Sequence, residues 1–108
     1  MGLPVWLLRL IEWLSPARTL STVQGDALPE RLPRRDLVLL QDGGEDWCVG
    51  LQCPCGCGQR IELPLICEVK PHWRLCLENG KPTLMPSVWL REGCRSHFFL
   101  RRGKVEWV

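Results

Sequence analysis

Three cysteines are crowded into the short stretch CPCGCG, residues 53–58. Cys53, Cys55 and Cys57 occupy alternate positions, so in an extended strand their side chains would point to one face. A straight row of thiols cannot surround one tetrahedral ion, so the chain must curl. The two glycines of the stretch permit a curl because glycine tolerates positive φ. Clustered cysteines in a reducing compartment usually mean metal, and the spacing therefore predicts a metal site in this turn.

A structural zinc site usually has four ligands, so the three cysteines need a partner. Cys94, in REGCRSH, is the favoured fourth ligand because it falls at a predicted turn, and His97 is the alternative. A redox pair of the thioredoxin type needs C-x-x-C spacing, which this stretch lacks. Three reduced thiols without metal remain the simplest alternative. The other cysteines lie within strand patterns and are expected to act as small buried side chains: Cys48, Cys67 and Cys76.

A serine and a histidine are the second pair of residues that could do chemistry. Ser87 and His97 lie ten residues apart in PSVWLREGCRSHFF. If residues 91–93 form a three-residue hairpin loop, Ser87 falls directly opposite His97. Opposite residues in an antiparallel pair have Cβ atoms about 4.5–5.5 Å apart, which allows a hydrogen bond. A Ser–His pair is the minimum for an activated hydroxyl nucleophile.

Other interpretations of this pair stay open. A register slip of one residue would place the two side chains on opposite faces, and Ser and His also meet by chance. Ser96 is the weaker nucleophile candidate because it points away from His97 along the same strand. The sequence does not show which third residue would orient the imidazole. Four carboxylates are candidates: Glu45, Asp46, Glu92 and Glu106.

Composition narrows the class of protein. The 108 residues are expected to form one domain, and the net charge of only +2 does not indicate a nucleic-acid partner. Seven cysteines, an odd number, argue against a fully paired disulfide framework. The apolar run at residues 3–14 lacks a preceding basic residue, contains Arg9 and Glu12, and is too short to span a bilayer. We therefore expect a cytoplasmic protein without a secretory signal or a transmembrane segment.

The pattern of elements predicts a mostly β protein. Residues 1–16 are expected to form an N-terminal helix, residues 17–35 a proline-containing linker, and residues 36–108 a zinc-binding β domain. Alternating apolar and polar residues and short turns such as DGGE, ENGK and RRGK predict about seven short antiparallel strands with hairpin links. A zinc site would stabilise a domain of this small size.

The order of these motifs resembles a known family. WCVGLQCPCGCG, IELPL, PTLMPSVWL and GCRSHFFLRRGKVEW follow one another between about residues 30 and 108, and together they resemble the BubE-like family of small bacterial proteins. Members of that family are encoded beside genes for bacterial ubiquitin-like conjugation. The helix and the linker lie outside the resemblance.

The resemblance implies a serine peptidase of a bacterial ubiquitin-like pathway, and with it a part in antiviral defence. Ser87 would be the nucleophile and His97 the general base, with zinc held by the cysteines of CPCGCG and Cys94. The expected partners are the C-terminal tail of a bacterial ubiquitin-like protein, its conjugates, and the associated activating and conjugating enzymes. Two alternatives remain: a non-catalytic zinc-binding adaptor, which would use the helix and the basic run 101–104, and a zinc hydrolase with an open water position.

Overall fold

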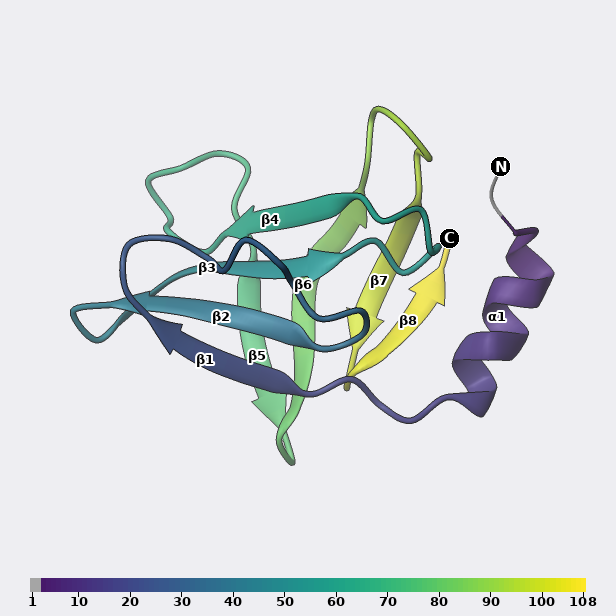
Figure 1. The fold of residues 1–108 in the computed structure, drawn as a ribbon, viewed down its shortest axis with the longest axis horizontal. Helices are drawn as coiled ribbons and strands as arrows, with labels where there is room; N and C mark the ends of the chain where they lie inside the picture. Colours follow the sequence, from purple (N-terminus) through teal and green to yellow (C-terminus); the bar gives the residue numbers. More distant parts are fainter. Residues whose placement is uncertain (1–2) are drawn as a thin grey trace.

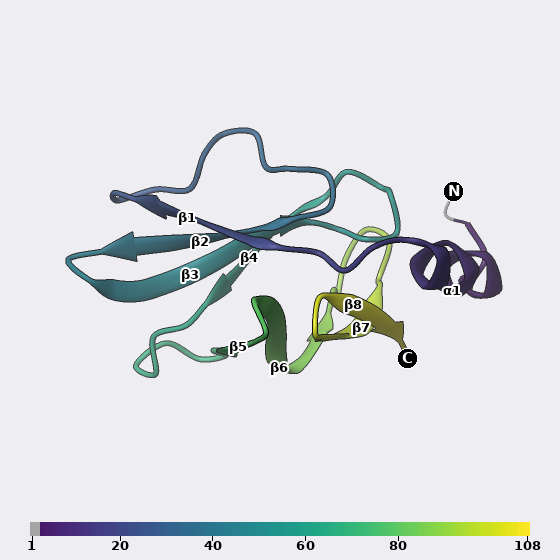
Figure 2. The same cartoon turned by 90° about the horizontal axis from the view of Figure 1, so that it is seen from below.

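The protein consists of two four-stranded β-sheets and one helix, in a computed structural model that describes residues 3–108. The two sheets form stacked layers, and the helix stands at one end beside β8 (Figures 1 and 2). This confirms the prediction of a mostly β protein with one N-terminal helix. The elements are α1 (Val5–Leu14), β1 (Leu20–Gln24), β2 (Leu37–Asp42), β3 (Glu45–Gln52), β4 (Arg60–Pro64), β5 (Arg74–Glu78), β6 (Lys81–Trp89), β7 (His97–Arg101) and β8 (Lys104–Trp107).

The first sheet has the order β1-β2-β3-β4. β2 and β3 form the predicted hairpin, with Gly43 and Gly44 both at positive φ in the turn. β3 and β4 are antiparallel and are connected by the CPCGCG stretch. The cysteine-rich turn therefore lies at one end of this sheet.

The second sheet has the order β5-β6-β7-β8, with antiparallel pairing throughout. Asn79 and Gly80 turn the chain between β5 and β6, and Arg102 and Gly103 turn it between β7 and β8, all four with positive φ. The predicted strands after residue 36 are thus found, although β7 begins only at His97.

The core lies between the two sheets. On four strands the core residues lie two positions apart, as the period of two requires: Leu37 and Leu39 on β2, Val49 and Leu51 on β3, Ile61 and Leu63 on β4, and Phe98 and Leu100 on β7. β6 contributes Leu84 and Val88, and β8 contributes Val105. The intervening side chains of β6 and β7 point outward, and this outer face carries the Ser–His pair described below.

The segment 17–35, expected to be a linker, contains β1. Leu20–Gln24 pairs with β2 in parallel, from Leu20 opposite Leu37 to Gln24 opposite Gln41. The first sheet is therefore mixed, and residues 3–108 form eight strands where about seven antiparallel ones were expected. The boundaries at residues 16 and 35 stay a prediction, and residues 1–2 of the predicted helical region lie outside the described residues.

Helix α1 contacts the rest of the molecule through the side that carries Leu8 and Glu12, both of which are buried. Glu12 is buried and forms an ion pair with the buried Arg18, Oε2 to Nη1 at 2.5 Å. The same carboxylate accepts the backbone N–H of Val105 at 2.9 Å. The Lys104 ammonium donates to the carbonyl groups of Glu12 and Ser15 at the end of the helix. Within residues 3–108, no helix is both long and apolar enough to cross a membrane.

Candidate active site and metal centre

The candidate nucleophile lies at an irregularity in β6. Leu84 pairs with Leu100, whereas Val88 pairs with Phe98, so residues 85–87 lie opposite a single residue of β7. Pro86 lacks the N–H that a regular ladder would require, and a bulge at this position accommodates it. The bulge ends at Ser87, and bulges commonly re-aim side chains next to functional sites.

Ser87 and His97 are in hydrogen-bonding contact. The hydroxyl oxygen of Ser87 lies 3.0 Å from Nε2 of His97, and both side chains are half-buried. The predicted register was wrong, because Trp89 and not Ser87 lies opposite His97. The predicted three-residue loop is in fact longer: residues 90–96 lie outside the strands, and the N–H of Leu90 donates to the carbonyl of Ser96 at 2.8 Å. A shift of two residues keeps Ser87 on the same face as His97, so the contact survives as a diagonal pair.

The imidazole of His97 is held by aromatic stacking. The ring of Trp89 lies parallel to it, with centroids 4.8 Å apart and an interplanar angle of 8°. The guanidinium carbon of Arg91 lies 4.0 Å from the centroid of the Trp89 ring. Among the described residues, none of the four candidate carboxylates hydrogen-bonds to His97: Glu106 pairs with Arg101, Asp46 accepts from Gln41, and Glu45 and Glu92 make no such contact.

The four candidate metal ligands come together. The sulfur atoms of Cys53, Cys55, Cys57 and Cys94 all lie within 4.8 Å of one another. Cys53 Sγ is 3.4 Å from that of Cys55 and 3.6 Å from that of Cys94. Zn–S bonds of about 2.3 Å place neighbouring sulfurs of a tetrahedron about 3.8 Å apart, so the geometry fits a four-thiolate site. His97, the alternative ligand, is not part of this group within the described chain.

The electrostatics of the cluster also fit a cation. Burial raises the pKa of the Cys53 thiol and, to a smaller extent, that of Cys57. Burial opposes ionisation of Cys94 too, but hydrogen bonds from the Ser96 hydroxyl and N–H and from Cys53 and Cys57 lower its pKa to about 6. The protein alone thus stabilises the thiolate of Cys94 and opposes ionisation of Cys53 and Cys57. Four thiolates at this spacing require a cation to offset their repulsion.

The local chain conformation explains how alternate cysteines surround one point. The N–H of Cys53 donates to the carbonyl of Gln59 at 2.8 Å, and the N–H of Gly56 donates to the carbonyl of Cys53 at 3.2 Å. Gly56 and Gly58 have φ values of +91° and +83°, the left-handed conformation that the curl was expected to need. Cys94 reaches this turn from the β6–β7 loop, so the cluster joins the two sheets three residues before His97.

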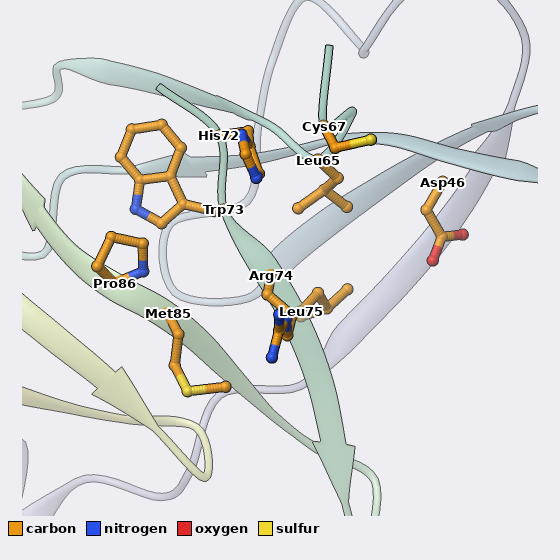
Figure 3. Close-up of a pocket in the computed structure, with 9 residues that line it drawn as sticks. All are labelled: Asp46, Leu65, Cys67, His72, Trp73, Arg74, Leu75, Met85 and Pro86. Atoms are coloured by element: carbon orange, nitrogen blue, oxygen red, sulfur yellow. The ribbon is translucent and has the colours of Figure 1, made fainter. Parts of the chain in front are cut away.

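A groove of about 560 Å³ begins next to Ser87. Its lining residues are shown in Figure 3: Asp46, Leu65, Cys67, His72, Trp73, Arg74, Leu75, Met85 and Pro86. Pro86 is the chain neighbour of Ser87, and the indole N–H of Trp73 donates to the carbonyl of Ser87 at 3.3 Å. Cys67 was expected inside a strand, but it is exposed and lies in the β4–β5 connection.

Sequence reasoning missed three side chains around these sites. Trp89 shares the face of Ser87 because it lies two residues further along β6, and this spacing was a usable signal. Ser96 was considered only as a nucleophile, yet its hydroxyl lies 3.1 Å from Cys94 Sγ and 3.5 Å from Cys53 Sγ. No sequence pattern indicated the contact of Trp73 with Ser87, because this contact depends on how β5 approaches β6.

Together these features describe a class of protein: a small β protein with a Ser–His pair on one sheet and a four-cysteine cluster joining both sheets. The chain belongs to the BubE family. The family model that matches residues 24–108 is described as "Bacterial ubiquitination-like system serine protease (BubE)". This confirms the resemblance, and the match includes every candidate site residue but not α1. No curated protein and no solved structure matches the chain.

Proposed function

We propose that this protein is a serine peptidase that cleaves at the C-terminal tail of a bacterial ubiquitin-like protein, to process its precursor or to release it from conjugates. The observation that carries the proposal is the 3.0 Å contact between Ser87 Oγ and His97 Nε2 in a chain of a family described as serine proteases. A nucleophile and a base within hydrogen-bonding distance are the geometric requirement for this chemistry.

The chemistry follows from the two side chains. With its proton on Nδ1, His97 accepts the hydroxyl proton of Ser87 at Nε2 while the serine oxygen bonds to the scissile carbonyl carbon. Backbone N–H groups near Ser87 would stabilise the oxyanion of the tetrahedral intermediate. The imidazolium then gives its proton to the leaving amine as the C–N bond breaks. Water, deprotonated by His97, hydrolyses the acyl-enzyme and restores the serine.

Zinc is proposed as a structural ion held by Cys53, Cys55, Cys57 and Cys94. When bound, it would cross-link the β3–β4 turn to the loop that leads into His97. Four thiolates complete a tetrahedral shell and leave no position for a reacting water. The sulfur geometry therefore favours the serine mechanism over a zinc hydrolase.

The groove of Figure 3 is proposed to hold the substrate chain next to the scissile bond. Its walls are mostly apolar. Pro86 directly precedes Ser87 in the chain, and the indole N–H of Trp73 donates to the carbonyl of Ser87. We further propose that the enzyme works in the cytoplasm with the partners of a ubiquitin-like pathway. The expected part in antiviral defence stays a prediction.

A cleavage assay tests the proposal. A bacterial ubiquitin-like protein is fused through its C-terminus to a reporter and incubated with wild type, with Ser87→Ala and with Ser21→Ala. Ser21 is exposed on β1, outside the groove and the cluster, so it serves as the matched control. We expect wild type and Ser21→Ala to cleave and Ser87→Ala to be inactive with its metal content unchanged. Cleavage by Ser87→Ala at the wild-type rate would refute the serine mechanism.

A non-catalytic adaptor is the second candidate function, favoured by the large apolar surface of α1. Absence of cleavage by a folded, metal-containing wild type would support it. In that case the ubiquitin-like protein should still bind, and binding should be equal for wild type and Ser87→Ala.

A further inference from the structure

Helix α1 exposes most of its apolar side chains, with Leu8 the buried exception. The most exposed are Trp13 at 78%, Leu14 at 70% and Trp6 at 67%. Val5, Leu10 and Ile11 are also more than 40% exposed. Of the thirteen large apolar side chains exposed within residues 3–108, seven lie between residues 3 and 14. An apolar patch concentrated on one element marks an interaction surface rather than ordinary surface variation.

The orientation of the helix is fixed by its polar contacts. Glu12 is the acidic residue of α1, and it is buried against Arg18 and the N–H of Val105. Lys104 donates to the last carbonyl groups of the helix. Rotation of the helix to bury its apolar side would separate this buried ion pair, which is costly. These contacts therefore hold the apolar face of α1 toward the solvent.

Basic residues flank this face on both sides. A cleft on one side is lined by Ile11, Arg34 and Arg35, and a cleft on the other side is lined by Arg9, Trp13 and Lys104. Both acidic residues of the second cleft are already paired, Glu12 with Arg18 and Glu106 with Arg101. The surface around the helix is thus apolar in the middle and cationic at its edges.

The two tryptophans suit an interface between water and lipid. Trp6 and Trp13 are seven residues apart, two helical turns, and so share one side of α1 about 10 Å apart. Indole rings favour the headgroup level of a bilayer, where the ring is shielded and the N–H stays hydrated. A ten-residue helix is about 15 Å long, which suits lying in the interface plane.

We propose that α1 docks this protein on the surface of an anionic lipid bilayer. The apolar side chains enter the boundary between headgroups and acyl chains, and Arg9, Arg34 and Arg35 face the lipid phosphates. A second copy fits less well, because a twofold contact pairs the same patch with itself and brings the basic edges of both copies together. This proposal does not rest on the peptidase activity.

Vesicle binding by the full chain tests it. The probes are vesicles of phosphatidylcholine alone and of phosphatidylcholine with phosphatidylserine, read by co-sedimentation and by the blue shift of tryptophan fluorescence. We expect binding to the anionic vesicles, weakened by added salt. Replacement of both Trp6 and Trp13 by Ala should lower the affinity about tenfold or more. Trp47→Ala, on β3, is the matched control and should bind as wild type does.

Charge reversal tests the basic edge. Arg34→Glu should weaken binding to the anionic vesicles, whereas Lys81→Glu, at the β5–β6 turn, should have little effect. All of these side chains are exposed, so circular dichroism should show an intact fold. Absence of binding to the anionic vesicles, or equal binding by wild type and the double tryptophan variant, would overturn the proposal. A wild-type dimer that the double variant loses, without vesicle binding, would assign the face to a second copy.

Discussion

Ser87 and His97 share one hydrogen bond, so their contributions to catalysis should not add. We predict that His97→Ala lowers kcat by about 10³-fold or more, as expected when a base is removed from a nucleophile. The double variant Ser87→Ala/His97→Ala should lose no more than either single variant, because residues that act as a unit are not additive. Steady-state kinetics of the three variants measure this. A double variant whose loss equals the product of the single losses would mean that the two side chains act independently.

Trp89 restrains the imidazole of His97 from the face of the ring, where a triad carboxylate would instead accept from the edge at Nδ1. Its ring stacks on His97 with centroids 4.8 Å apart and so limits rotation of the imidazole. We predict that Trp89→Ala lowers kcat about tenfold to a hundredfold with little change in KM, because a misplaced base slows proton transfer. Trp89→Phe preserves a stacking ring and should recover most of this loss. Equal kcat values for the Ala and Phe variants would assign the role of Trp89 to something other than stacking.

At the scale of elements, most strands could be predicted from the sequence and β1 could not. β4, β7 and β8 alternate between buried and more exposed side chains, β2 is a continuous run of buried apolar residues, and the hairpin turns contain glycine. In β1, Leu20 and Val23 are only partly buried and the other three residues are exposed, so no periodic signal exists. Its parallel partner lies seventeen residues further along the chain, and such pairing depends on tertiary contacts.

The β6–β7 loop shows why the register of the Ser–His pair was mispredicted. Gly93 suggested a short hairpin loop, but Arg95 also adopts the left-handed conformation, with φ at +56°. A non-glycine residue in this region is uncommon and gives little warning in a sequence. The longer loop brings Cys94 to the thiol cluster, whose other three cysteines lie in the β3–β4 turn of the other sheet. The length of this loop therefore depends on a contact with that sheet.

The turn between β7 and β8 offers a test of packing at the element scale. Gly103 has φ at +76°, and a Cβ at this position would lie 2.6 Å from the carbonyl oxygen of Arg18. We predict that Gly103→Ala lowers the free energy of unfolding by more than Gly80→Ala. Gly80 has nearly the same φ, +77°, but open space around it, so its substitution costs only the backbone strain of about 1–2 kcal/mol. Equal losses in urea denaturation would mean that Arg18 moves aside freely.

At the scale of the whole molecule, the thiol cluster is a contact between the two sheets. We predict that Cys55→Ser loses the metal and lowers Tm by about 10 °C or more, because a structural ion contributes directly to folding. Ser87→Ala should keep both the metal and the Tm of wild type. Metal analysis and calorimetry of the two variants measure the difference. Equal destabilisation by both would contradict the separation of a structural site from a catalytic one.

The position of the cluster along the chain also bears on the denatured state. Cys53 and Cys94, whose sulfurs lie 3.6 Å apart, are separated by 41 residues. In the chain-entropy treatment of cross-links, closing a loop of this length removes about 4 kcal/mol of conformational entropy, as TΔS, from the unfolded ensemble. An ion that stays bound to the unfolded thiolates would thus reduce the number of conformations that the chain samples before β4 to β6 assemble. The cluster would then act on the rate of refolding as well as on the native state.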